Sequence, residues 1–165
     1  MATNTAKYLS YAEAWRRIKA ATAQGFHIEV VTLCESIISD RLLSYVRGFN
    51  PSSNANVRTQ FASLISEWRK LAVGGLPPYG TSDLGAAVNS LREKRNAVVH
   101  SLTKSKPGTP TSQLQSFITR AEQAAKAGEG LARAVSNWHK RRLASHRKKQ
   151  AVHAKAKNVA NPSLR

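Results

Sequence analysis

The sequence predicts an all-α fold, an up-and-down bundle of four or five helices followed by a basic C-terminal tail. Apolar residues recur three and four positions apart along most of the chain, which is the repeat of one face of an α-helix. The 6 Pro and 9 Gly cluster between these periodic stretches, and no stretch alternates apolar and polar residues as a half-buried strand does. At 165 residues, the chain has the length of one domain with a hydrophobic core.

Two long helices are predicted in the N-terminal part of the chain. The first covers about residues 5–23, and its apolar face carries Tyr8, Tyr11, Trp15 and Ile18. The second covers about residues 26–47, and two overlapping lines of apolar residues give it a wide stripe. Such a stripe is typical of a central helix that other helices contact on two sides. Cys34 lies on this stripe, so we expect it to be a core residue.

The third helix is expected over about residues 55–73, followed by a Gly- and Pro-rich loop over residues 74–80 that a helix could not traverse. The fourth helix can be capped by Thr81 or Ser82, which places Asp83 in its first turn, where a negative charge suits the helix dipole. It runs to about residue 102, with an apolar residue at every third or fourth position. Arg95 is the exception, because it occupies one of these apolar positions.

The fifth helix is expected to begin near Pro110 or Thr111 and to continue to Trp138. Beyond it the chain is rich in Lys, Arg, His and Ala and has little apolar content. We therefore expect a helical bundle over residues 1–138 and a basic tail over residues 139–165, the tail being either a helical extension or disordered.

Charge is the strongest global signal in the sequence. The chain has 26 Lys and Arg against 9 Asp and Glu, a net charge of +17. Residues 1–138 contain 17 of the basic residues and all 9 acids, which gives +8, and residues 139–165 contain the other 9 basic residues. Such a balance predicts a polyanionic partner, with nucleic acid favoured over an anionic membrane because the tail has few large apolar residues to insert. The alternative is a basic surface that serves solubility only.

Cys34 is the single cysteine, which excludes an internal disulfide framework and suits a reducing compartment. The sequence shows neither a signal-peptide pattern nor an apolar run long enough to span a membrane. We therefore expect a cytoplasmic protein without membrane association. No cofactor or metal is expected, because His27 and Glu29 lack companion ligands at metal-binding spacing.

One short motif in the fourth helix suggests chemistry. Arg95 and Asn96 are followed, after three residues, by His100. This pattern resembles the arginine, polar, three-residue, histidine signature of HEPN domains (higher eukaryotes and prokaryotes nucleotide-binding). The predicted architecture, with a long second helix and the motif at the end of a late helix, resembles that family over about residues 5–140.

The same or nearly the same spacing of arginine and histidine occurs elsewhere in this basic chain. Arg141 and His146 are five positions apart, and Arg147 and His153 are six apart. The Arg95 instance differs because a small polar residue follows the arginine and because it lies within the predicted bundle. Arg95 also interrupts an apolar stripe, and a half-buried guanidinium is costly unless a partner or a substrate compensates its charge. Glu29, Glu35 and Asp40 on the second helix could approach the motif or could be ordinary surface charges.

The geometry of a helix limits what one copy of this motif can do. At about 100° per residue, Asn96 and His100 share a face, whereas Arg95 and His100 point about 140° apart. HEPN ribonucleases are understood to form their site at a dimer interface, so the resemblance implies a homodimer or a pair with another HEPN chain. Asn96 would then orient the imidazole or the phosphate.

The activity that the resemblance implies is metal-independent cleavage of RNA. His100 would transfer protons and Arg95 would hold the phosphate, leaving a 2′,3′-cyclic phosphate and a 5′-hydroxyl. Two groups of basic residues are candidates for RNA binding. Those near the motif are Arg92, Lys94, Lys104 and Lys106, and those in the tail are Lys140, Arg141, Arg142, Arg147, Lys148 and Lys149.

The family resemblance also suggests a toxin or defence setting, with an antitoxin or regulatory partner. One HEPN toxin subclass carries a tyrosine two residues after the histidine, which a partner nucleotidyltransferase modifies. Leu102 occupies that position here, so this type of antitoxin does not carry over. Two alternatives to a ribonuclease remain: a catalytically silent HEPN-like module that binds RNA or protein, and a basic nucleic-acid-packaging protein.

Overall fold

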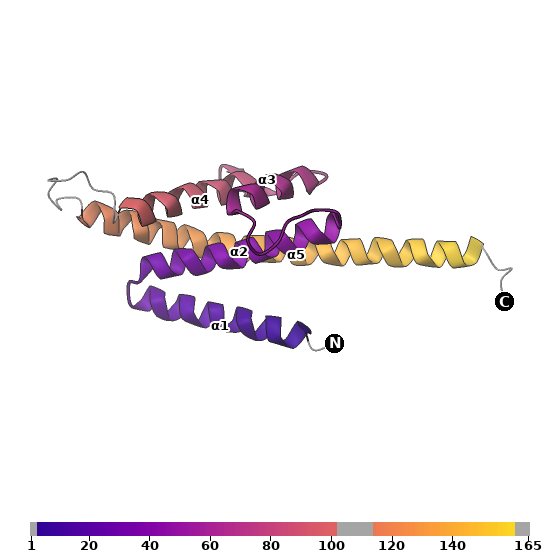
Figure 1. The fold of residues 1–165 in the computed structure, drawn as a ribbon, viewed down its shortest axis with the longest axis horizontal. Coiled ribbons are helices and arrows are strands. Elements are labelled where there is room, and N and C mark those ends of the chain that lie inside the picture. Colours follow the sequence, from indigo (N-terminus) through magenta and orange to yellow (C-terminus); the bar gives the residue numbers. More distant parts are fainter. Residues whose placement is uncertain (1–2, 102–113, 161–165) are drawn as a thin grey trace.

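The fold is an all-α bundle, as the sequence predicts. The computed structural model describes residues 3–101 and 114–160, and this part of the chain is almost entirely helical (Figure 1). Its elements, in chain order, are α1 (Thr3–Ala23), α2 (His27–Phe49), α3 (Phe61–Leu71), β1 (Pro78–Tyr79), β2 (Ser82–Asp83), α4 (Leu84–Ser101) and α5 (Leu114–Ala160). No helix in the described ranges is both long and apolar enough to span a membrane.

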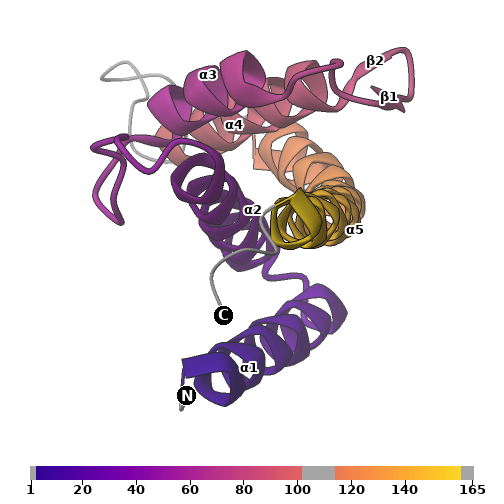
Figure 2. The same ribbon diagram turned by 90° about the vertical axis from the view of Figure 1, so that its right-hand side faces the viewer.

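Helix α2 is the centre of the bundle and contacts α1, α3, α4 and α5. Viewed along the bundle, α1 lies on one side of α2, and α3 and α4 lie on the other (Figure 2). The wide apolar stripe predicted for this helix is confirmed, since its buried residues are Val30, Val31, Cys34, Ile37, Ile38, Leu42, Tyr45 and Val46. The most extensive contact in the fold is between α2 and α5, and it carries much of the core.

Helix α3 begins later than predicted, at Phe61 rather than near residue 55. The preceding residues bond their backbone to short polar side chains instead of to a helix. The Asn56 side-chain oxygen accepts a hydrogen bond of 2.9 Å from the Arg58 N–H, and the Thr59 hydroxyl accepts one of 2.9 Å from the Asn56 N–H. Such side-chain bonds compete with helical ones, so the chain turns at residues 57–59 before α3 begins.

The predicted loop over residues 74–80 contains an unpredicted strand. Pro78 pairs with Asp83 and Tyr79 with Ser82, which makes a two-stranded antiparallel hairpin. Gly80 lies in its turn with φ of +61°, a conformation that glycine adopts without a steric penalty. With two residues in each strand, the hairpin is too short for an alternating pattern to reveal it.

The start of α4 also differs from the prediction. The helix begins at Leu84, and the Asp83 carboxylate accepts a hydrogen bond of 2.8 Å from the Ala86 N–H. Asp83 is therefore the N-cap itself, and the predicted cap by Thr81 or Ser82 is wrong. The Ser82 hydroxyl instead donates a hydrogen bond of 3.3 Å to the Asp83 carbonyl.

Helix α5 runs without a break through the predicted boundary at residue 138. Its first predicted residues, near position 110, lie outside the described ranges. Packing continues beyond the boundary, because His139 is only 2% exposed and the His146 ring lies 4.6 Å from that of Phe49. The first part of the basic segment is thus a helical extension that packs against the bundle, and Figure 1 shows α5 projecting beyond the other helices.

Candidate active site

The motif residues lie where the C-terminal half of α4 passes α2. Arg95 Nε is 3.0 Å from a carboxylate oxygen of Glu35 on α2, and the two side chains are 32% and 19% exposed. This ion pair explains how an arginine occupies an apolar position of α4. Of the three acids on α2 that could approach the motif, Glu35 is the one that pairs with Arg95.

The Glu35–Arg95 pair is only partly satisfied by hydrogen bonds. The Arg95 Nε–H is not aligned with the facing Glu35 oxygen, and neither atom has another hydrogen-bond partner within the described structure. Burial raises the pKa of Glu35, and the nearby charges of Arg95 and Arg92 offset this only in part. The pair therefore places a positive group and polar atoms with unused bonding capacity at a half-buried position.

Asn96 contacts the arginine of the motif. Arg95 Nη1 donates a hydrogen bond of 3.0 Å to the Asn96 side-chain oxygen, and both residues are half-buried. The guanidinium is thus held from two sides, by Glu35 across the helix interface and by Asn96 on its own helix. In this single chain Asn96 orients Arg95 rather than His100.

His100 is exposed in the last turn of α4. Because α4 is helical from Leu84 to Ser101, His100 and Arg95 leave the helix about 140° apart. One chain therefore does not bring the imidazole and the guanidinium to a common point. A histidine at a helix C-terminus also suits the helix dipole when it is protonated, which is a structural role that needs no substrate.

The other basic residues predicted near the motif differ in how they are engaged. The Arg92 Nε donates a hydrogen bond of 3.0 Å to Asn89, and its Nη2 is 3.4 Å from Glu93, which ties this side chain to its own helix. Lys94 is exposed. Lys104 and Lys106 lie outside the described residues.

The basic residues of α5 lie further along the bundle. Lys140, Arg141, Arg147 and Lys148 are exposed. Arg142 is instead half-buried. Its Nη2 donates a hydrogen bond of 3.2 Å to the Gly75 carbonyl, and its guanidinium lies 5.7 Å from the centre of the Trp138 ring. Lys149 belongs to α5, and its side chain is not among those described.

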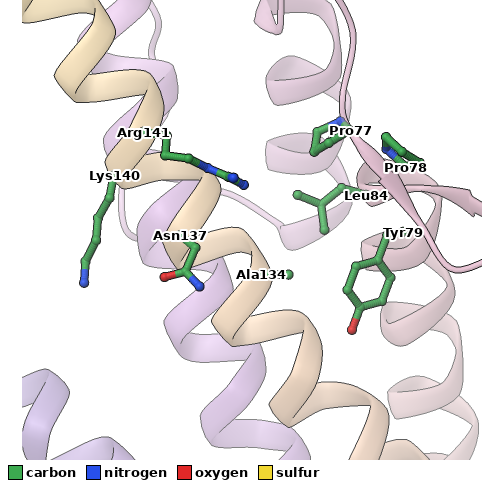
Figure 3. Close-up of a pocket in the computed structure, with 8 residues that line it drawn as sticks. All are labelled: Pro77, Pro78, Tyr79, Leu84, Ala134, Asn137, Lys140 and Arg141. Atoms are coloured by element: carbon green, nitrogen blue, oxygen red, sulfur yellow. The ribbon is translucent and has the colours of Figure 1, made fainter.

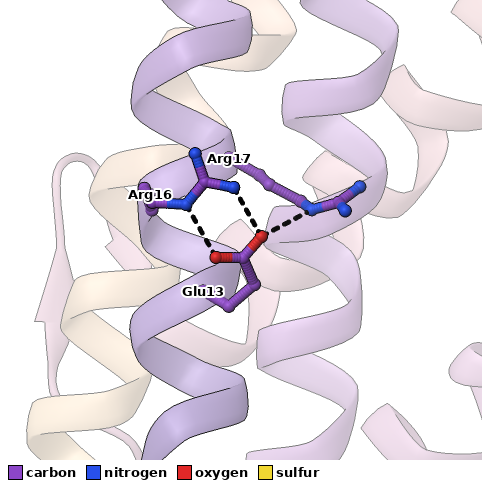
Figure 4. Close-up of polar contacts among 3 residues, drawn as sticks. All are labelled: Glu13, Arg16 and Arg17. Atoms are coloured by element: carbon purple, nitrogen blue, oxygen red, sulfur yellow. Dashed lines mark hydrogen bonds and ion pairs between the residues drawn. The ribbon is translucent and has the colours of Figure 1, made fainter.

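Part of the positive charge is balanced within the fold. On α1 the Glu13 carboxylate accepts hydrogen bonds from Arg16 at 2.7 Å and from Arg17 at 3.0 Å (Figure 4). These bonds lower the pKa of Glu13 to about 2, so its charge persists into acid. In contrast, the sequence contains no acidic residue after Glu129. The basic character of the second half of α5 is therefore uncompensated along the chain.

A pocket between the hairpin and α5 was not predicted from the sequence. It has a volume of about 500 Å³ and is lined by Pro77, Pro78, Tyr79, Leu84, Ala134, Asn137, Lys140 and Arg141 (Figure 3). The basic residues in it were identified by charge, but its aromatic wall depends on a hairpin that the sequence pattern does not reveal. The described residues contain no group of three or more His, Cys, Asp or Glu that could hold a metal ion.

The chain was compared with protein families, curated sequences and solved structures. No family model, no curated protein and no solved structure matches it. Its function can therefore be inferred only from its residues and their geometry.

Proposed function

We propose that this protein is a metal-independent endoribonuclease of the HEPN type, with Arg95, Asn96 and His100 as its catalytic residues. The observation that carries the proposal is the position of Arg95 within the apolar stripe of α4, held by Glu35 at 3.0 Å and by Asn96 at 3.0 Å. A guanidinium fixed in this way is prepared to bind a phosphate group in a bidentate manner. The exposed imidazole of His100, five positions further along α4, adds a group that can accept or donate a proton.

The proposed reaction is attack of a ribose 2′-hydroxyl on the adjacent phosphorus. One imidazole takes the 2′-hydroxyl proton, the bond from phosphorus to the 5′-oxygen breaks, and a second imidazole donates a proton to that oxygen. Arg95 stabilises the negative charge that grows on the phosphate oxygens in the transition state. The products are a 2′,3′-cyclic phosphate and a 5′-hydroxyl, and the step needs no metal ion.

The proposed active form contains two motifs. Arg95 and His100 point about 140° apart on one helix, so a second α4 is needed to complete a cleft that has both groups on its walls. The second chain is a copy of this protein or another HEPN chain. Two copies also supply the two imidazoles that the reaction uses as base and acid.

The biological setting that we propose is a toxin or defence system of the cytoplasm, controlled by an antitoxin or regulatory partner. This part rests on the HEPN resemblance alone. RNA would be held by the basic residues of α5 and by those near the motif.

A second candidate function is a silent HEPN-like module that binds RNA or protein. The observation that favours it is that both motif residues also have structural roles. Arg95 is paired with Glu35, and His100 lies at a helix C-terminus, where its charged form suits the dipole. A packaging protein is the remaining alternative, and equally tight binding of duplex DNA and single-stranded RNA would favour it.

The proposal can be tested by incubating the purified protein with a labelled mixed-sequence RNA in excess EDTA. We expect cleavage that leaves 2′,3′-cyclic phosphate ends, and no cleavage of the same sequence made of 2′-O-methyl nucleotides. Salt-sensitive binding without cleavage would instead support the silent module. Cleavage of the 2′-O-methyl strand would contradict attack by the 2′-hydroxyl.

A further inference from the structure

The pocket between the hairpin and α5 combines an aromatic ring, two prolines and basic residues. Tyr79, Pro77 and Pro78 form one wall, and Asn137 and Arg141 lie on the other (Figure 3). The guanidinium of Arg141 extends from α5 toward the hairpin, while the Lys140 side chain points away from it (Figure 3). Its volume of about 500 Å³ is within the range of small-ligand sites.

Several contacts fix the walls of this pocket relative to each other. Arg142 on α5 donates a hydrogen bond of 3.2 Å to the carbonyl of Gly75, and the Leu84 N–H donates one of 2.9 Å to the Pro77 carbonyl. Tyr79 reaches across to α5, where a methyl group on Gly130 would lie 2.9 Å from its hydroxyl oxygen. The missing side chain at Gly130 therefore allows the ring to lie close to the helix, and the pocket is largely preformed.

The chemistry of the walls favours a nucleotide as the ligand. Aromatic faces bind nucleobases by stacking, which tolerates any sequence, and a guanidinium binds phosphate oxygens. Arg141 is exposed and lies in a segment of the chain with no acidic residue, so nothing in α5 beyond Glu129 neutralises it. A base that stacks on the Tyr79 ring must be unpaired, so the interior of a duplex cannot bind in this way.

We propose that this pocket binds one nucleotide of a single-stranded RNA, with the base against Tyr79 and a phosphate held by Arg141. The identity of the ligand as RNA rests on the proposed function. The pocket lies away from the motif, because Leu84, which lines it, and His100 are at opposite ends of α4.

The separation sets a length requirement on the RNA. Leu84 and His100 are 16 positions apart on α4, which is about 24 Å at ~1.5 Å per residue. At ~3.4 Å per nucleotide of stacked strand, this distance corresponds to about seven nucleotides. The pocket is thus an accessory site, and a stacked strand that occupies the motif needs about seven nucleotides to reach it.

The test is binding of fluorescent 2′-O-methyl RNA, which cannot undergo attack by a 2′-hydroxyl, measured by anisotropy at several salt concentrations. For a twelve-nucleotide strand we expect Tyr79→Leu to weaken binding about tenfold, because base stacking is lost. Arg141→Ala should weaken it and make the log–log salt slope shallower by about 0.7, which is one phosphate contact. The matched control is Arg58→Ala, which removes an equal charge from an exposed loop and should leave the slope unchanged.

Gly130→Ala provides a variant that changes no charge and does not weaken the helix. The added methyl group should displace the Tyr79 ring and weaken binding of the single strand, but not of a blunt duplex of equal length. Equal effects of Arg141→Ala and Arg58→Ala, or unchanged binding by Tyr79→Leu, would overturn the proposal. So would equal competition by an acidic peptide such as polyglutamate. Because the probe cannot be cut, these outcomes do not depend on whether the protein is a ribonuclease.

Discussion

The side chains of Glu35 and Arg95 show how a single residue can be identified from sequence while its partner cannot. Arg95 stands out because it occupies an apolar position, and a repeat of three and four residues is enough to detect it. Which acid pairs with Arg95 depends on how far α2 and α4 are shifted along each other, and the local sequence does not encode this shift. Glu29, Glu35 and Asp40 were therefore equivalent on sequence grounds, and only the packed structure distinguishes Glu35.

Replacing the carboxylate of Glu35 should weaken both the fold and the proposed activity. We expect Glu35→Gln to lower the free energy of unfolding by about 1 kcal/mol, because it leaves a half-buried guanidinium without a counter-charge. RNA cleavage should fall as well, since Arg95 is then held by Asn96 alone. Urea unfolding and cleavage rates provide the measurements. Glu29→Gln is the control, because Glu29 is an exposed acid on the same helix and its loss should change both quantities far less.

His139 should make the stability of the protein depend on pH. Burial lowers its pKa to about 4, with smaller contributions in the same direction from Arg41 and Lys7 and an opposing one from Asp40. The unfolded state, with an ordinary histidine pKa, takes up this proton first, so stability falls as the pH drops from about 6.5 to 4. The loss should be about 2 kcal/mol between pH 8 and pH 5. Urea unfolding at both pH values checks this, and a His139→Leu variant that shows the same loss would contradict it.

For the helices, the sequence predicts that each one exists, but it predicts the residues at which each helix begins and ends less well. The five helical stretches are encoded by long repeats of apolar residues, and the structure confirms them. Their ends depend on competition between a few hydrogen bonds. Asn56 and Thr59 delay the start of α3, and the Asp83 carboxylate, rather than the hydroxyl of Thr81 or Ser82, caps α4.

The close contact between α2 and α5 depends on Gly128. A methyl group at this position would lie 3.2 Å from Cβ of Cys34 and 3.6 Å from a methyl group of Leu91. Because Cβ of Cys34 is fixed to the backbone of α2, we expect Gly128→Ala to push the helices apart and lower stability by about 1 kcal/mol. Gly48→Ala should have the opposite effect, a gain of about 1 kcal/mol, because no atom lies within 4 Å of the added group. Thermal or urea unfolding of both variants checks the pair, and stabilisation of both would contradict the account.

For the molecule as a whole, the predicted boundary between bundle and tail does not coincide with a break in structure. Composition changes at residue 139, but α5 and its packing continue, because His139 and His146 contact the bundle. The hydrophobic pattern cannot show this, since the two residues that make these contacts are histidines rather than aliphatic residues. The helical nature of the segment was one of two alternatives that the sequence left open.

Two truncations separate packing from charge in this segment. A chain that ends at residue 146 keeps the packed part of α5 and should retain its stability, whereas a chain that ends at residue 138 loses these contacts and should unfold at lower urea concentration. The chain that ends at residue 146 should also show a shallower salt slope of single-stranded RNA binding, by about 0.7 for each phosphate that residues 147–165 contact. An unchanged slope would mean that residues 147–165 do not bind RNA.

The proposed role of His100 in RNA cleavage can be tested by comparing three proteins. Wild type, His100→Ala and His146→Phe are purified identically and incubated with the same labelled RNA in EDTA. His146 has the same spacing from Arg141 as His100 has from Arg95, and phenylalanine keeps an aromatic ring against Phe49. We predict that wild type and His146→Phe cleave the RNA and that His100→Ala cleaves it at least about a hundredfold more slowly. Equal cleavage by all three proteins would contradict the assignment of the site.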